Sequence, residues 1–134
     1  MKLRLKKTSG FSLIELMVVM AIIAIIAAIA YPNYQQSIQR SRRAAAAGCM
    51  VSQSQFMERY YTTNMSYVGA VLPACQAEVT PFYLSNFAAG PTATTYTLQV
   101  VPQGAQVNDV CGTLTIDQTG LRTPDPTVRP ECWR

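Results

Sequence analysis

The feature that most constrains this chain is an unbroken apolar run near its amino terminus. Residues 11–30 carry no charge apart from Glu15. As a helix rising about 1.5 Å per residue they would measure roughly 30 Å, the thickness of bilayer hydrocarbon. The run is preceded by four basic residues: Lys2, Arg4, Lys6 and Lys7. Because basic residues stay on the cytoplasmic side, the run predicts a membrane-spanning helix with the rest of the chain exported.

A cleaved secretory signal is the alternative explanation, because such signals also place an apolar core behind basic residues. The run here is longer than the usual signal core. No small-x-small cleavage site with a polar continuation follows it, and Gly10-Phe11 abuts its near side. We therefore expect the apolar run to remain in the mature protein.

These residues resemble a known signal. The pattern is a short basic leader and an apolar helix, marked by Gly10, Phe11, Ser12, Glu15 and Pro32. It is similar to the class III signal of type IV pilins and pseudopilins, and the resemblance is specific over residues 6–35. It implies that a prepilin peptidase cleaves between Gly10 and Phe11 on the cytoplasmic face, that Phe11 is N-methylated, and that the apolar helix is retained.

Glu15 needs a physical explanation, since a carboxylate near the centre of a span costs about 2.5 to 3.5 kcal/mol. In one interpretation it lies near the head groups and favours the positive end of its own helix, worth up to about 1 kcal/mol. In the other it pairs, within a filament, with the new amine of a neighbour's Phe11 and sets the axial register between subunits. With Gly10 and Phe11 beside it, we favour the second interpretation.

The composition argues against catalysis and against a metal site. Histidine is absent, which removes the commonest general base and metal ligand. The chain has no nucleophile elbow and no phosphate-binding glycine loop, so we expect no enzyme and no cofactor. Without residues 1–10, seven arginines balance seven acids, so the basic pI belongs largely to the leader and is not a nucleic-acid signature.

The sequence divides into a leader (1–10), a membrane-spanning assembly helix (11–31) and an extracytoplasmic head (32–134). We expect one helix from about residue 12 to about 62, kinked at Pro32 rather than ended by it. Its second half is amphipathic, with an apolar stripe of Tyr34, Ile38, Ala45, Cys49, Phe56 and Tyr60 at helical spacing. Arg40, Arg42 and Arg43 are expected on a solvated face, and Gly48 on a smooth surface that a loop or helix could approach.

The rest of the head predicts a small antiparallel meander that covers the helix stripe, an α+β fold. After a connecting loop, alternating and β-branched residues predict strands at about 81–87, 95–101 and 111–116, with a short return at 121–122. The proline-rich tail, residues 123–134, is expected to be irregular. The resemblance implies the pilin fold for the whole.

Four cysteines in an oxidising compartment predict two disulfides, and three connectivities are open. We favour Cys111 with Cys132, which would tie the tail to the sheet, and Cys49 with Cys75, which would tie the loop to the helix. A cysteine-only metal site is disfavoured because the chain lacks Cys-x-x-Cys. In weaker form, residues 94–98, 111–116 and 132–134 look like the carboxy-terminal half of PilE-type minor pilins.

The resemblance implies a structural subunit of a type IV pilus, a minor pilin that serves pilus assembly, twitching motility or adhesion. Its expected partners are other pilins through the apolar helix, prepilin peptidase and the pilus assembly machinery. The chain would cross the inner membrane once and then enter the extracellular filament. In this interpretation Gly10 and Phe11 carry processing, and Glu15 and Pro32 carry assembly.

Two alternatives stay open. The first is a DNA-binding pilin that acts as an uptake receptor through exposed arginines such as Arg122, Arg129 and Arg134, although three acids accompany these three arginines in residues 112–134. The second is a pseudopilin of a type II secretion system, whose leader would be the same.

Overall fold

The structure is a computed structural model that describes residues 10–133. The basic leader, residues 1–9, and the candidate contact residue Arg134 lie outside the described residues. The chain divides into two compact units between Gln36 and Ser37. One long helix, α1 (Leu13–Asn64), belongs to both units, and all strands belong to the second.

The first unit consists of the amino-terminal part of α1. The helix begins after Ser12, whose Oγ accepts a hydrogen bond of 3.2 Å from the backbone N–H of Glu15, the contact of a typical N-cap. Pro32 lies inside the helix, so the interpretation in which this proline ends the helix is wrong. The large apolar side chains from Phe11 to Ile29 are all exposed, and this helix is long and apolar enough to cross a membrane.

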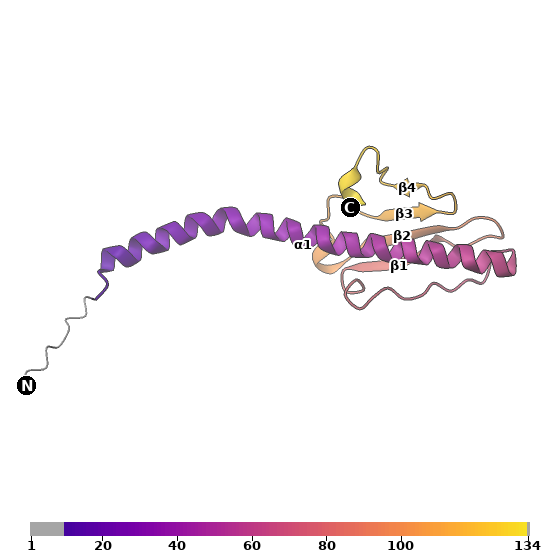
Figure 1. The fold of residues 1–134 in the computed structure, drawn as a ribbon, viewed down its shortest axis with the longest axis horizontal. Coiled ribbons are helices and arrows are strands. Elements are labelled where there is room, and N and C mark those ends of the chain that lie inside the picture. The colour runs from indigo at the N-terminus through magenta and orange to yellow at the C-terminus, as the bar shows by residue number, and fades with distance from the viewer. Residues whose placement is uncertain (1–9, 134) are drawn as a thin grey trace, which may run out of the picture. The chain divides into compact units, whose positions relative to one another are not determined.

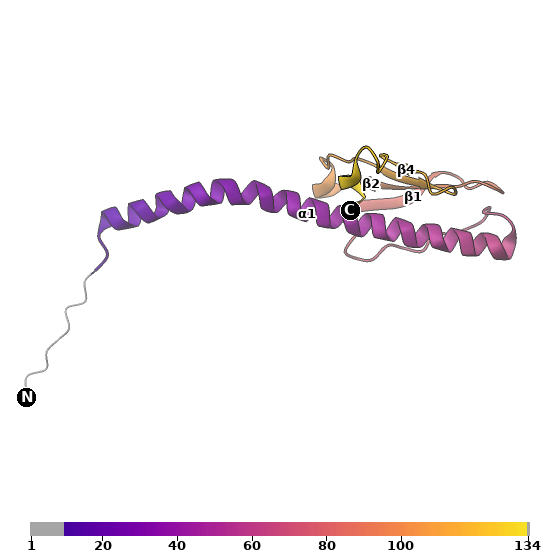
Figure 2. The ribbon, with the colours of Figure 1, turned by 45° about the horizontal axis from the view of Figure 1, so that its top comes forward.

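The second unit packs the rest of α1 against a four-stranded antiparallel sheet of order β1-β2-β3-β4, which confirms the predicted α+β meander. The strands are β1 (Tyr83–Ala89), β2 (Thr97–Pro102), β3 (Leu114–Asp117) and β4 (Arg122–Thr123). In the view of Figure 1 this half of α1 lies across the strands, and Figure 2 shows the sheet on one side of it. Two short 3-10 helices, η1 (Gly104–Gln106) and η2 (Pro130–Cys132), complete the unit.

Several strand boundaries differ from the sequence predictions; β2, for example, begins at Thr97 rather than at residue 95. β1 begins two residues later than expected, because residues 79–83 form a turn in which Tyr83 donates its N–H to Val79 O. β3 begins at Leu114 rather than at Cys111. Gly112 has a φ of +59°, a conformation that glycine adopts without strain, and its N–H donates to Asp109 O, so these residues form a turn. The tail, expected to be irregular, contains η2.

The core lies between one face of the sheet and one face of α1. Alternating residues of β2 and β3 supply its sheet side: Leu98, Val100, Leu114 and Ile116 are at most 4% exposed. The helix side consists of Ala46, Ala47, Met50 and Met57, accompanied by the buried polar residues Arg43 and Gln53. The predicted apolar stripe is therefore wrong: the buried face of α1 is displaced from it by about one residue along the helix.

The stripe was misplaced because two of its true members are polar. Tyr34 and Ala45 are exposed, and Ile38, Cys49, Phe56 and Tyr60 are half-buried at the edge of the packed face. Polar side chains can occupy a core when their groups are hydrogen-bonded. Gln53 meets this condition, since its Nε2 donates to Pro73 O at 2.8 Å and its Oε1 accepts from Ser85 Oγ at 2.7 Å.

Two disulfides close the head, Cys49–Cys75 and Cys111–Cys132. This is the pairing that the sequence analysis favours. The first ties the loop before β1 to α1, and the second ties η2 to the turn before β3. Both Cα–Cα separations are 5.6 Å, within the range that disulfide geometry allows.

Candidate functional site

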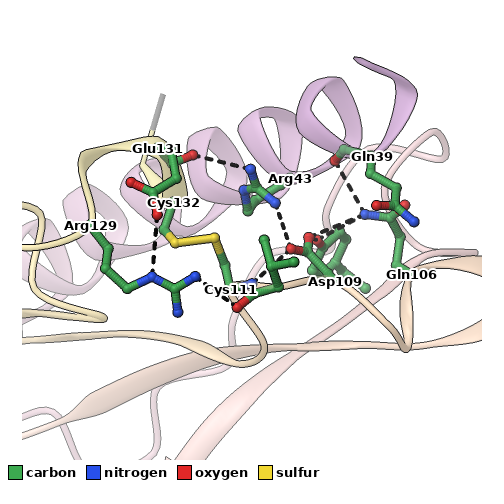
Figure 3. Close-up of polar contacts among 10 residues, drawn as sticks. Gln39, Arg43, Gln106, Asp109, Cys111, Arg129, Glu131 and Cys132 are labelled. Atoms are coloured by element: carbon green, nitrogen blue, oxygen red, sulfur yellow. Dashed lines mark hydrogen bonds and ion pairs between the residues drawn. A yellow bond between two sulfur atoms is a disulfide. The ribbon is translucent and has the colours of Figure 1, made fainter. Parts of the chain in front are cut away.

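A buried polar network joins α1 to the loops at one end of the sheet. Arg43, on α1, places Nη1 2.5 Å from Asp109 Oδ1, and the two side chains are 3% and 0% exposed. Asp109 also accepts hydrogen bonds from Tyr83 Oη and from the backbone N–H of Cys111. The Asp109 carboxylate therefore has donors from three different segments of the head, as Figure 3 shows for the helix and the loop.

The same network holds the end of the chain. Arg43 Nη2 donates to Glu131 O at 3.1 Å, and Glu131 precedes Cys132 of the second disulfide. Gln106 donates to Gln39 O at 3.2 Å (Figure 3). Desolvation of the Tyr83 hydroxyl, together with its hydrogen bond to the Asp109 carboxylate, raises the tyrosine pKa well above its ordinary value. The network is thus neutral at Tyr83 and carries its charge on the Arg43–Asp109 pair.

Sequence reasoning missed this network. Arg43 was expected on a solvated face beside Arg40 and Arg42, and this expectation is wrong because Arg43 is 3% exposed. Arg42 is half-buried, with its guanidinium 3.7 Å from the centroid of the Phe82 ring, and Arg40 is exposed. A signal was present in the spacing, since Arg43 precedes the buried Met50 by seven residues and so lies on the same helix face.

The carboxy-terminal segment, residues 122–133, forms a surface that carries two of the arginines singled out in the sequence. The Arg122 guanidinium lies 5.0 Å from the centroid of the Trp133 ring, and Trp133 Nε1 donates to Pro124 O at 2.7 Å. Arg129 donates to Val110 O at 3.0 Å and to Glu131 Oε1 at 3.2 Å. Both arginines are half-buried, and each is held in place by these contacts.

The acids near this surface are engaged by local hydrogen bonds. Desolvation raises the pKa of Asp117, but hydrogen bonds from Thr119, Leu121 and Gly120 outweigh it and leave the pKa below its usual value. Hydrogen bonds from Thr127 likewise lower the pKa of Asp125. Within residues 10–133, the arginines that pair with a carboxylate within 4.0 Å are Arg43 and Arg129. Arg122 has no carboxylate within that distance in the same residues.

The candidate processing and assembly residues belong to the first unit, whereas this surface belongs to the second. Gly10 and Phe11 precede the helix, and Phe11 is 76% exposed. Glu15 lies in the first turn of α1 and is exposed. No group of three or more histidine, cysteine or acidic residues suited to a metal ion occurs in the described part of the chain.

The apolar amino-terminal helix followed by a helix-on-sheet head defines the class of protein as a type IV pilin. Residues 5–31 match the prokaryotic N-terminal methylation motif. A solved structure described as a type IV pilin from Shewanella oneidensis is 32% identical, with a TM-score of 0.55 over 64% of this chain and 91% of that chain. A search of curated proteins found no match.

Within that class, residues 32–115 match the family model described as type IV minor pilin ComP, DNA uptake sequence receptor. The match covers more than half of the chain, so the chain belongs to this family of type IV minor pilins. The family and the fold are those of structural subunits. The chain is anchored in the inner membrane by its amino-terminal helix before it enters the pilus filament. The pseudopilin alternative gains no support from these matches.

Proposed function

We propose that this minor pilin binds DNA through its head and thereby serves DNA uptake by the pilus. The observation that carries the proposal is the match of residues 32–115 to the family described as a DNA uptake sequence receptor. The matched region contains most of the head, including the network of Arg43 and Asp109. The alternative that ranked second in the sequence analysis is therefore the function that we now favour.

The charge distribution of the carboxy-terminal segment supports this proposal. Arg122 has no carboxylate partner in the described residues, and its planar guanidinium lies beside the half-exposed Trp133 ring. Guanidinium groups bind phosphate oxygens in a bidentate manner.

The buried network of Arg43 and Asp109 holds part of the carboxy-terminal surface in place. Arg43 donates to Glu131 O, and Arg129 donates to Val110 O, next to Asp109. The backbone that follows Arg129 is thereby tied to α1, and the Arg129 side chain is tied to the loop before β3. A preordered backbone lowers the entropy lost when DNA binds, so the network acts as a positioning element for the arginines.

The proposal is tested by measuring how the mature full-length chain, in mild detergent, binds a fluorescent DNA duplex as the salt concentration rises. Each phosphate contact made by an arginine releases counterions, so affinity should fall steeply with salt. Arg122→Gln should weaken binding of all sequences and reduce the salt slope by about one. Binding that is absent, or independent of salt, would contradict the proposal.

A matched control comes from the far end of α1. Arg59 is exposed and carries the same charge as Arg122, but it lies on the helix rather than in the carboxy-terminal segment. Arg59→Gln should therefore leave the salt slope unchanged. If both variants lose affinity equally, net charge rather than the carboxy-terminal surface determines binding.

We also propose that the amino-terminal residues carry processing and assembly. Cleavage follows Gly10, the new Phe11 amine is methylated, and residues 11–31 remain as the membrane span and later as the filament contact. The match of residues 5–31 to the methylation motif supports this assignment. The exposed apolar side chains of this helix supply a surface that packed neighbours would cover.

Glu15 provides the test of assembly. A carboxylate among packed spans is tolerated when it is paired, and the amine of a neighbour's Phe11 would supply the partner. Glu15→Ala should insert into the membrane in normal amounts yet be depleted from sheared pili, whereas Ser12→Ala, a change on the same turn, should be incorporated. Normal incorporation of Glu15→Ala would count against the pairing.

A further inference from the structure

The two disulfides differ in how far a reagent could reach them. Cys111 and Cys132 are 5% and 0% exposed. Cys49 and Cys75 are half-buried and line a hollow of about 480 Å³ that opens to solvent between α1 and the segment before β1. Thiol–disulfide exchange requires a thiolate to touch a disulfide sulfur. The difference in solvent access alone should therefore make Cys49–Cys75 react faster than Cys111–Cys132.

The hollow also lacks features that would repel a thiolate. Its lining contains no charged side chain, and four of its nine members are small residues: Ala45, Gly48, Ser52 and Ala74. A Cβ added at Gly48 would meet nothing within 4 Å. The smooth surface that the sequence predicted at Gly48 therefore lies open beside Cys49.

The two sulfur atoms of this disulfide are not equivalent. Gln53 Nε2 lies 3.8 Å from Cys75 Sγ and donates to it. The amide cannot easily turn away, because Gln53 is 2% exposed and is held by hydrogen bonds to Pro73 and Ser85. A hydrogen-bond donor favours the charged form of its acceptor, so Cys75 is the better leaving group.

We propose that Cys49–Cys75 is a reversible exchange site for low-molecular-weight thiols, with attack directed to Cys49. The incoming thiolate forms a bond to Cys49 Sγ, the Cys49–Cys75 bond breaks, and its electron pair remains on Cys75 Sγ beside Gln53. Water then protonates the Cys75 thiolate. A second thiol releases Cys49 as a thiol, so two thiols are oxidised to one disulfide while the protein disulfide is reduced.

The exchange would loosen the segment before β1 and leave the rest of the head held by its second disulfide. Residues 73–75 border this hollow and a second one of about 190 Å³, and they are tied to α1 by the disulfide and by the Gln53 contact with Pro73. The Cys111–Cys132 bond lies elsewhere and stays intact. This inference does not depend on DNA binding, so either can fail alone.

The test treats the full-length chain, in mild detergent near about pH 8, with reduced glutathione. Samples are quenched with acid, and the mixed disulfides and free thiols are located by peptide mass spectrometry. Cys49–Cys75 should open more than about tenfold faster than Cys111–Cys132, because the buried bond reacts only after structural opening. The first adduct should be on Cys49. Equal rates, or a first adduct on Cys75, would overturn the proposal.

Substitutions at Gly48 separate access from stability. Gly48→Leu should fill the hollow and slow the opening of Cys49–Cys75 by about tenfold or more, since attack needs direct contact. Gly48→Ala removes the glycine penalty for a helix without filling the hollow, and Ala44→Leu adds the same bulk outside the lining. Both controls should react like the native chain. If Gly48→Leu does so too, the hollow is not the route of attack.

Gln53→Leu tests the choice of sulfur. Without the amide donor the two sulfurs become similar, and glutathione should be found on both cysteines rather than on Cys49 alone. An unchanged preference for Cys49 would show that Gln53 does not direct the reaction.

Discussion

Arg43 and Asp109 form a buried ion pair whose two members are supported unequally. Asp109 keeps donors from Tyr83, Gln106 and Cys111 when Arg43 is removed. Arg43 keeps the single acceptor Glu131 O when Asp109 is removed. An uncompensated buried charge is strongly destabilising, so the loss of the carboxylate should harm the head more than the loss of the guanidinium.

We therefore expect Asp109→Leu to lower the free energy of unfolding by about 3 to 5 kcal/mol, and Arg43→Met to lower it by less. Urea unfolding of the mature chain in detergent, followed by the fluorescence of Trp133, measures both values. The reverse order would show that the guanidinium, not the carboxylate, is the centre of the network.

The tyrosines predict an alkaline limit to stability. Desolvation raises the pKa of Tyr96 to about 12, with a further increase from the Glu58 carboxylate, and Tyr83 is raised as well. A raised pKa in the folded state gives stability that is complete below about pH 10, the unfolded value, and is lost as the pH rises above it.

Near about pH 11, above the ordinary pKa of a tyrosine, Tyr83 and Tyr96 should stay neutral in the folded chain. Ultraviolet absorbance of tyrosinate and circular dichroism, recorded together, should show these last ionisations coinciding with unfolding. A single transition near about pH 10 with the fold intact would contradict the structure around these hydroxyls.

Individual functional residues could be predicted where the signal lies within a short stretch of the sequence. The four cysteines and the signal around Gly10 and Phe11 can be recognised from spacing and compartment alone. Asp109 could not be recognised, because its partners Arg43 and Tyr83 lie 66 and 26 residues away. Only the tertiary fold brings such groups together.

At the scale of elements, α1 is the clearest case of a correct element with a misassigned face. Its extent, predicted as 12–62, agrees with Leu13–Asn64 within the uncertainty of helix ends. Its buried face was displaced because Arg43 was expected on a solvated face and Gln53 was not included in the apolar stripe. Hydropathy describes side chains one at a time, whereas burial depends on whether a fold supplies hydrogen-bond partners.

The observed buried face of α1 and the face assigned from hydropathy lead to opposite predictions for two neighbouring residues. Met57 is 0% exposed, whereas Phe56 is half-buried and was expected in the core. Met57→Ala should cost about 2 to 5 kcal/mol of unfolding free energy and Phe56→Ala less. Urea unfolding of the two variants gives the comparison, and a larger loss for Phe56→Ala would favour the face assigned from hydropathy.

The positions of the strands were easier to predict from the sequence than the residues at which the strands begin and end. β2 alternates cleanly, so its position follows from side-chain pattern. β3 was extended too far because Cys111 and Thr113 are compatible with a strand, whereas the positive φ of Gly112 and the Asp109 turn interrupt it. Backbone conformation at a glycine is not visible in a hydropathy pattern.

At the scale of the whole molecule, the chain combines two tasks in two units. The amino-terminal helix anchors it in the membrane, and we propose that the same helix joins it to the filament while the head presents a surface to the exterior. The sequence predicted the pilin fold, because a membrane span and a class III signal are one-dimensional patterns. It ranked DNA binding second, because net charge does not report which arginines a fold leaves unpaired.

The central claim is that this subunit gives the filament its affinity for DNA. The most direct test measures how much labelled duplex DNA is retained by sheared, washed pili from cells with the native chain and from cells with Glu15→Ala. Pili with the native subunit should retain DNA. When Glu15→Ala keeps the subunit out of the filament, DNA retention should fall in proportion to the amount of subunit lost. Equal retention by filaments with and without this subunit would contradict the claim.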